Sequence, residues 1–156
     1  MINAGSSTVK WKLIDRSSGY KVRGGIVERL VGPGDDGLDH EAAFRSILAG
    51  LDDEDISVVG HRVVHGGTRF TTATLVTDEV EEQIDELSAI APLHNPVNLA
   101  GIRATRAAFP DLPHFAVFDT AFHQTLPAAA TYSLPAQLTE RHGIRRYGFH
   151  GISYQH

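Results

Sequence analysis

The fold is decided by the stretch Val58-Val59-Gly60-His61-Arg62-Val63-Val64-His65-Gly66-Gly67. Its β-branched residues and its closing pair of glycines predict a strand that ends in a turn. Side chains alternate between the two faces of a strand, so Arg62 shares one face with Val64, whereas His61 and His65 share the other. An arginine flanked by apolar residues on its own face is unusual, and it makes this strand a candidate for binding an anion.

Two more strands are predicted upstream of this stretch. Apolar and polar residues alternate over Thr8–Asp15, and a turn at Ser17–Gly19 leads into a further strand around Tyr20–Leu30. Only two residues precede the turn Asn3–Ser7. Strands usually run for about 5–6 residues, so we expect a first strand that is curtailed.

Downstream, the pattern changes to helices that alternate with strands. Apolar residues recur at helical spacing, and we expect Thr77 and Asn95 to cap two of the helices. The predicted elements are helices over Asp39–Leu51, from Thr77, from Asn95-Pro96 to just before Pro110, and over Pro135–His142, with strands over Ile56–His65 and His114–Phe118. Gly32–Gly37 has the composition of a loop. This order of elements predicts an α/β domain with a mixed sheet.

The composition is that of an ordinary globular domain. The chain has 156 residues, of which 42% are hydrophobic, and its formal charge is −5. The absence of cysteine from the sequence excludes disulfides, thiolate catalysis and metal sites built on Cys. The acidic balance without a basic run makes nucleic acid a poor partner, and no apolar stretch is long enough to span a membrane. The N-terminus lacks the order of a signal peptide, so we expect a cytoplasmic protein.

The segment Asn3–Lys10 is the first candidate site. A turn centred on Gly5 can aim backbone N–H groups and the Ser6 hydroxyl at one point, and Lys10 shares a strand face with Thr8. The segment is therefore able to cradle a phosphate, although it lacks the Walker spacing. The alternative is a hairpin turn that binds no ligand.

Arg62 and Val64 form the second candidate. A guanidinium fits a carboxylate or a phosphate bidentately, and a neighbouring valine offers a wall for a small apolar group, which suits a short carboxylic acid. The alternative is a structural ion pair between Arg62 and a carboxylate on a neighbouring element. His61 and His65 would lie roughly 13 Å apart on a strand, which favours packed histidines over a metal site.

Three more residues stand where chemistry is possible. His94 precedes the predicted helix start at Asn95, where the positive end of a helix favours an anion. Asp119 ends a strand at the edge where α/β proteins bind ligands, and it suits a magnesium ion or a general base. His150 lies close to glycines and can donate to phosphoryl oxygens. Capping, surface and simple turn roles are the alternatives for these three residues.

These candidates occur together and in an order that is typical of one family. The chain resembles the acetokinase family in five blocks that cover nearly the whole sequence. The blocks are Asn3–Lys10, Gly60–Gly67, Ala91–Pro96, Val117–His123 and Arg145–Gly151. Five blocks in the family's order are highly specific, so the resemblance favours the functional interpretation of Arg62, Asp119 and His150 over the alternatives above.

The resemblance implies the fold of the acetate and sugar kinase, heat-shock and actin superfamily, in which two ribonuclease H-like lobes enclose a cleft. Residues 1–156 would form the first lobe of such a kinase, a mixed sheet flanked by helices. Family members are more than twice this long, so the lobe that binds the nucleotide would lie outside this chain. The closing residues Gly151–Tyr154 also depart from the family's Gly-Thr-Ser-His, and Tyr154 stands where the family has a histidine.

The resemblance implies a role for each candidate residue. Arg62 would hold the acetate carboxylate, while His94 and His150 would contact the phosphoryl group. Asp119 would be the catalytic aspartate near magnesium, with Asn3 as a second metal-side ligand. The residues implied to form the methyl pocket are Val64, Leu93 and Phe149. Those implied to bind the phosphates of the nucleotide are Asn3, Ser6, Thr8 and Lys10.

The implied reaction is the reversible in-line transfer of the γ-phosphoryl group of ATP to acetate, which gives acetyl phosphate and ADP and uses Mg²⁺ as cofactor. Propionate or butyrate kinase activity is a close alternative, because one methylene is worth only about 1–3 kcal/mol in an apolar pocket. A third possibility is a non-catalytic lobe that binds a small anion or a partner. We expect the complete enzyme to be a homodimer, and this chain to be inactive without the second lobe.

Overall fold

A six-stranded mixed sheet forms the centre of the computed structural model, which describes residues 1–31, 38–51, 54–130 and 134–156. The strands are β1 (Ile2–Ala4), β2 (Thr8–Ile14), β3 (Lys21–Glu28), β4 (Val59–Val63), β5 (Thr74–Leu75) and β6 (His114–Phe118). Their order across the sheet is β3-β2-β1-β4-β6-β5. β1, β4 and β6 run parallel, and the other strands are antiparallel to their neighbours. The predicted mixed sheet is confirmed, while the predicted loop Gly32–Gly37 lies outside the described residues.

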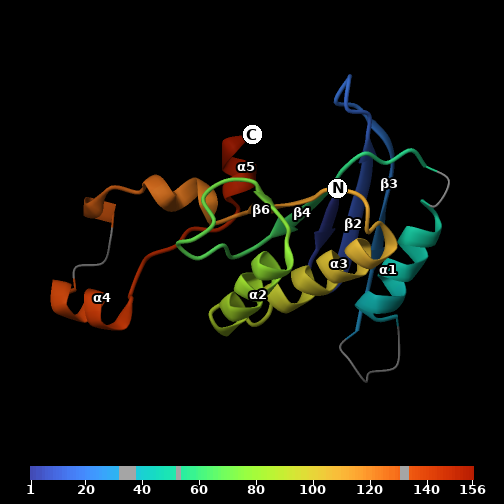
Figure 1. The fold of residues 1–156 in the computed structure, drawn as a ribbon. Helices are drawn as coiled ribbons and strands as arrows, with labels where there is room; N and C mark the ends of the chain where they lie inside the picture. Colours follow the sequence, from blue (N-terminus) through green and yellow to red (C-terminus); the bar gives the residue numbers. More distant parts are fainter. Residues whose placement is uncertain (32–37, 52–53, 131–133) are drawn as a thin grey trace.

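Five α-helices accompany the sheet in the described residues, and three of them cover one of its faces (Figure 1). The five helices are α1 (His40–Ala49), α2 (Asp78–Glu86), α3 (Asn95–Ala108), α4 (Ala136–His142) and α5 (Gly151–Gln155). Figure 1 shows α1, α2 and α3 lying side by side along one face, whereas α4 stands away from the sheet and α5 lies beyond the end of β6. None of the described helices combines the length and the apolarity needed to cross a membrane.

The apolar core lies between the sheet and these three helices. One cluster joins β1 and β2 to α1 and includes Val9 and Phe44; a second joins β4 and β6 to α2 and α3 and includes Ile84 and Leu99. Burying a side chain of this size contributes about 1.5–3 kcal/mol. α3 can approach α1 closely because Gly101 has no side chain. A Cβ atom at this position would lie only 2.8 Å from the Phe44 ring.

The helix starts agree with the sequence at two positions and differ at one. Asp39 and Thr77 cap α1 and α2, since their side chains accept hydrogen bonds from the backbone N–H groups of Ala42 and Val80. Asn95 does not cap α3, so that expectation is wrong. His94 occupies the cap position without a side-chain hydrogen bond, and Asn95 is the first helical residue, with its side chain fully buried.

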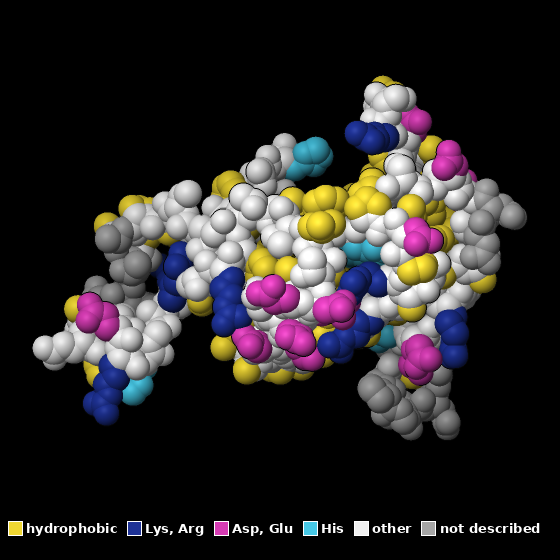
Figure 2. Space-filling model, in the orientation of Figure 1, with side chains coloured by type: hydrophobic (Ala, Val, Ile, Leu, Met, Phe, Trp, Pro, Cys, Tyr) yellow, Lys and Arg dark blue, Asp and Glu magenta, His cyan; other side chains and the backbone are white. Residues whose placement is uncertain are grey.

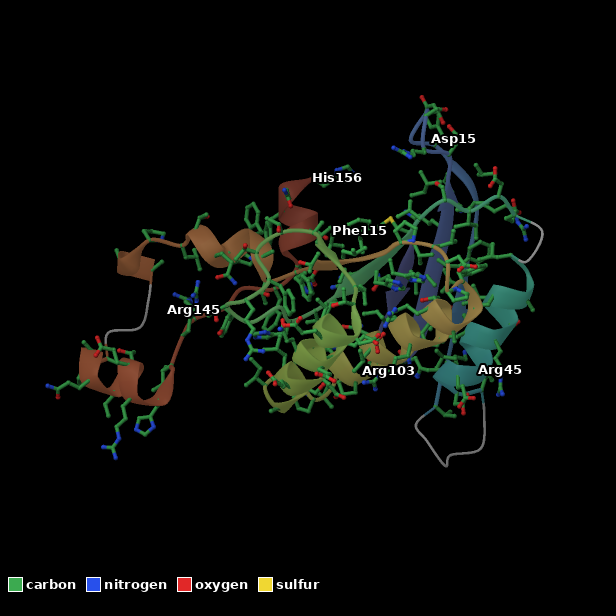
Figure 3. All side chains as sticks on the ribbon, in the orientation of Figure 1. Asp15, Arg45, Arg103, Phe115, Arg145 and His156 are labelled. Atoms are coloured by element: carbon green, nitrogen blue, oxygen red, sulfur yellow. The ribbon has the colours of Figure 1, made fainter. Side chains whose placement is uncertain are left out.

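The two faces of the molecule differ in surface chemistry. Acidic and basic side chains gather over α2 and α3 in Figure 2, where Arg103 and Arg106 form ion pairs with carboxylates of α2. Phe115 projects from the sheet on the face away from α3, as Figure 3 shows, and it is partly exposed. Figure 1 shows α1, α2 and α3 on the opposite face, so none of these three helices covers this second face.

Candidate functional site

The candidate site lies at the carboxyl edge of the three parallel strands. Asn3 is the second residue of β1, Arg62 is the fourth residue of β4, and Asp119 directly follows β6. β1, β4 and β6 are adjacent and parallel, so their carboxyl ends meet at the same edge of the sheet. Ligands of α/β proteins bind at this edge. The structure therefore brings together three residues that lie far apart in the sequence.

The Arg62 guanidinium connects the three strands. Its Nε donates to Asp119 Oδ1 at 3.0 Å, its Nη2 donates to Asp119 Oδ2, and its Nη1 donates to Asn3 Oδ1 at 3.0 Å. The Asp119 side chain is 1% exposed, whereas the Arg62 side chain is 25% exposed. An arginine has five N–H donors. Among the described residues these bonds use three of them, so one donor on each terminal nitrogen remains for a ligand.

His150 lies over the buried carboxylate. Its Nδ1 is 3.8 Å from Asp119 Oδ2, and its ring is largely exposed to solvent. The next residue, Gly151, donates its backbone N–H to the Asp119 carbonyl at 3.0 Å. A Cβ atom at Gly151 would lie 2.1 Å from that oxygen, so this approach requires glycine. We call Asn3, Arg62, Asp119 and His150 the carboxyl-edge cluster.

Two buried asparagines of α3 hold the strand ends that carry the cluster. Asn98 accepts from the backbone N–H of Val64 at 3.0 Å and donates to the carbonyl of Ala4 at 2.8 Å, so it ties β4 to β1. Asn95 accepts from the N–H of His65 at 3.1 Å and donates to the carbonyl of the same residue at 3.0 Å. Sequence reasoning missed both roles. The sequence did carry a signal for them. Residues three apart lie on the same face of a helix, and two asparagines on a buried face need hydrogen-bond partners in the neighbouring strand ends.

The turn between β1 and β2 adjoins the cluster. It is closed by the Gly5 N–H, which donates to the Thr8 carbonyl at 2.7 Å. β1 extends to Ala4, so Asn3 is a strand residue and not part of the turn as expected. Asn3 and Lys10 are register partners, and directly opposite residues share a face. Ser6 and Lys10 are exposed, and Thr8 is half-buried. This arrangement leaves the predicted phosphate-side groups accessible.

The residues predicted for a methyl pocket do not form a closed pocket here. Val64 is buried at the end of β4, but Leu93 is 74% exposed and Phe149 is 47% exposed. His94 is also exposed, at the start of α3. Asn98 and Asn95 fasten the end of β4 to the first turn of α3, which brings Val64 close to Leu93 and His94. Phe149 reaches the same region through its ring contact with His65. The structure thus brings the residues to one region without enclosing them.

The oxygen atoms around Arg62 form only a partial metal site. Across the described ranges, no three side chains of the His, Cys, Asp and Glu types gather closely enough to hold a metal ion. Asn3 Oδ1 and the Asp119 carboxylate are the oxygen donors that Mg²⁺ prefers, and Mg²⁺ is often held by one or two carboxylates together with substrate phosphates. The donor set therefore fits Mg²⁺ when phosphate oxygens complete it.

His61 of β4 and His65, which follows this strand, belong to the protein interior. His61 Nε2 lies 3.0 Å from His114 Nδ1, under α3 and away from the cluster. Burial lowers the pKa of His61 to about 3, with smaller effects from His114 and the amino terminus. His65 Nδ1 accepts from the Gly67 N–H at 3.0 Å, and burial lowers the pKa of His65 as well.

Comparisons with known proteins point to one family. A family sequence model described as "Acetokinase family" matches residues 34–156. The chain is 50% identical to the acetate kinase of Leifsonia xyli, across 100% of this chain and 45% of that protein. It is 45% identical to the acetate kinase of Streptomyces coelicolor, across 99% of this chain and 44% of that protein. The chain thus spans less than half the length of these curated relatives.

Solved structures show the same fold. A propionate kinase from Francisella tularensis matches with a TM-score of 0.87 and 37% identity, and the match covers 98% of this chain and 45% of that one. The acetate kinase of Porphyromonas gingivalis matches with a TM-score of 0.85 and 38% identity over the same shares of the two chains. The fold is therefore that of the N-terminal portion of these kinases, as the sequence predicts.

Proposed function

The chain belongs to the acetokinase family, and on this premise we propose that the carboxyl-edge cluster is the acid-binding half of a phosphotransferase site. The reaction would move the γ-phosphoryl group of ATP to acetate, giving acetyl phosphate and ADP. Direct in-line transfer needs positioning and charge stabilisation more than covalent catalysis. The cluster offers these two properties, because it holds a guanidinium in place with donors to spare.

The observation that carries the proposal is the position of Arg62. Asp119 and Asn3 fix its guanidinium from two strands, and the remaining N–H donors are free to form a charge-assisted pair with the carboxylate of a short acid. A guanidinium that is already held loses little freedom when it binds. Val64, which is buried two residues after Arg62 in the chain, would contribute to the apolar side of the acid site.

The other cluster residues would act on the phosphoryl group. His150 is exposed above Asp119 and would donate to the oxygens of the group in transfer. His94, at the positive end of α3, and the turn residues Ser6, Thr8 and Lys10 would contact phosphate oxygens. Asp119 and Asn3 would hold Mg²⁺ on the phosphate side. When bound there, this ion would neutralise charge on the phosphates.

We propose further that residues 1–156 form the first of two lobes and do not turn over ATP by themselves. The chain spans 45% of the Leifsonia xyli relative, and a cluster that faces water on one side has weakened electrostatic contacts. The test is a coupled acetyl-phosphate assay on this chain and on a hybrid enzyme, in which the chain is joined to the part of that relative which it does not span. Activity in the hybrid alone supports the proposal, and an inactive hybrid that folds contradicts it.

Propionate is a second candidate substrate, because the Francisella tularensis structure with a TM-score of 0.87 is a propionate kinase. Leu93 and Phe149 are exposed, so they leave room at the apolar side of the site. The ratio of kcat/KM values for acetate, propionate and butyrate in the hybrid enzyme decides between the acids. A tenfold preference for propionate corresponds to a difference of about 1.4 kcal/mol in transition-state binding. A preference of this size or larger would make propionate the assigned acceptor in place of acetate.

A further inference from the structure

His150 has a backbone conformation that needs support from its surroundings. Its φ and ψ angles are 58° and 23°, in the left-handed region. Within the described ranges, Arg29 is the one other non-glycine residue with a positive φ. Conformations of this kind persist only where neighbouring contacts over-determine them, and they concentrate at functional sites. The contacts on each side of His150 therefore decide where its imidazole lies.

The contact on the C-terminal side is a backbone hydrogen bond. Gly151 donates its N–H to the Asp119 carbonyl at 3.0 Å, and Gly151 is buried. This bond ties the chain to the end of β6, next to the carboxylate that His150 overlies. It cannot fix φ of His150 by itself, because the segment before His150 would still be free to turn.

The contacts on the N-terminal side come from two histidines that the proposed mechanism does not use. His123 Nε2 donates to the carbonyl oxygen of Phe149 at 3.0 Å. The ring of His65 meets the ring of Phe149 edge-on, with centroids 5.9 Å apart, and meets the ring of Tyr147 in the same way at 4.5 Å. Phe149 is thus held at its carbonyl by one imidazole and at its ring by the other.

The packing around Gly148 shows how closely the segment follows His123. A Cβ atom at Gly148 would lie 2.4 Å from Cγ of the His123 ring. The His123 ring itself packs edge-on against the rings of Phe122 and Tyr154, with centroids 5.2 Å and 5.9 Å away. His123 therefore has a defined position on which the backbone before His150 can rest.

His65 is also fixed independently of the segment that it contacts. Its Nδ1 accepts from the Gly67 N–H, which leaves the proton of the neutral ring on Nε2. Its backbone N–H and carbonyl are both bonded to the Asn95 side chain. The ring is buried against the start of α3, so it is a rigid surface for Phe149 and Tyr147.

We propose that His65 and His123 are positioning residues, which hold Phe149 so that His150 keeps its left-handed conformation and points its imidazole at Asp119. The inference rests on the proposed function only in that the placed His150 imidazole would act on the phosphoryl group. The placement itself is a property of this chain and can be measured without turnover.

The first test is nuclear magnetic resonance of the isotope-labelled 156-residue chain. A residue with positive φ gives a strong intraresidue NOE between its amide proton and its Hα, and we expect this signal for His150. His123→Ala should weaken it, whereas His123→Gln should keep it, because the glutamine amide offers an N–H donor near the position of Nε2. His65→Asn should also weaken it, because asparagine can still accept from Gly67 but has no ring.

His142→Ala is the matched control, since His142 is an exposed histidine in the last turn of α4 and should leave the signal unchanged. Chemical-shift dispersion over β4 and β6 shows that each variant is folded, and His123→Ala and His65→Asn provide independent readings if one of them is not. A His150 signal that survives in the folded variants of both histidines overturns the proposal.

The second test measures rates in the hybrid enzyme. His123→Ala should lower kcat by up to about 10²-fold, with less effect on the KM values, because misplacement of a catalytic group costs the transition state more than the ground state. His123→Gln should recover most of the loss. Equal kcat values for Ala and Gln contradict the positioning role. An inactive unaltered hybrid instead contradicts the proposed function, and the NMR result still decides the inference.

Discussion

His61 and Arg62 are consecutive residues of β4, and each reaches across to β6, but they do so on opposite faces of the sheet. His61 pairs with His114 beneath α3, where both rings are buried and stacked with centroids 5.3 Å apart. Arg62 pairs with Asp119 at the open carboxyl edge. The two links start from adjacent residues of β4, and they end at the first residue of β6 and at the residue that follows this strand.

The two pairs differ in whether hydrogen-bond donors remain unused. His114 Nε2 donates to the Phe109 carbonyl at 3.1 Å, so its Nδ1 is the acceptor for the N–H of His61 Nε2, and the pair is complete as two neutral rings. The Arg62 pair is charged, partly exposed and keeps donors for another group. A polar pair that is complete supports the fold, whereas one with donors left at a sheet edge is suited to binding. The predictions below test that distinction.

The largest effect is expected from Arg62→Ala. It leaves the Asp119 carboxylate buried without its cation, which costs about 3–5 kcal/mol of unfolding free energy. Arg45→Ala is the control, because Arg45 and Glu41 form an exposed pair on α1 that is worth at most about 1 kcal/mol. Urea denaturation of both variants measures the difference. A loss below 1 kcal/mol for Arg62→Ala would show that the pair does not stabilise the edge.

A smaller effect is expected on the other face when the pH falls. The folded pKa of His61 is about 3 and the unfolded value is about 6.5, so the unfolded chain binds more protons between these values. Stability is therefore complete above pH 6.5 and decreases as the pH falls toward 3, by about 2 kcal/mol between pH 6.5 and 4.5. Burial lowers the pKa of His114 too, which acts in the same direction.

Urea midpoints at a series of pH values measure this loss. Replacing both rings, as in His61→Leu with His114→Leu, should flatten the dependence in that range, because it removes the two imidazoles whose pKa values differ between the folded and unfolded chain. His142→Ala serves as the control, since this exposed histidine should leave the slope unchanged. An unchanged slope in the double variant would show that other groups cause the acid sensitivity.

Asn98→Ala tests the hydrogen bonds by which α3 holds the ends of β4 and β1 together. The variant leaves the Val64 N–H and the Ala4 carbonyl without a side-chain partner, which should cost about 1–3 kcal/mol of unfolding free energy. Hydrogen exchange should speed up at Val64. Arg103→Ala on the outer side of α3 is the control, because it removes ion pairs with α2 and no hydrogen bond to the backbone of β1 or β4. Unaltered exchange at Val64 would contradict the role of Asn98.

Local sequence patterns predicted most of the fold. Helical spacing and capping residues located α1, α2 and the end of α4 at His142. These features depend on residues within one or two turns of each other. The family resemblance predicted the residues that the structure gathers in the carboxyl-edge cluster, and the arrangement of two lobes that it implies stays a prediction.

The partners of the site residues were harder to predict. Arg62 and Asp119 are 57 residues apart, and only the sheet register shows that the ion pair forms between them. Asn95 was expected to cap a helix but instead binds the backbone of His65, 30 residues away. The strained backbone of His150 has no sequence signal at all, because it is imposed by contacts from other elements.

The most direct test of the central claim is the KM for each substrate in the hybrid enzyme carrying Arg62→Lys. Lysine keeps the positive charge beside Asp119 but loses the planar fork that pairs with a second carboxylate. We expect the KM for acetate to rise by tenfold or more, while the KM for ATP stays within about twofold of the unaltered hybrid. An equal rise for both substrates, or no rise for acetate, would contradict the assignment of Arg62 to the acid.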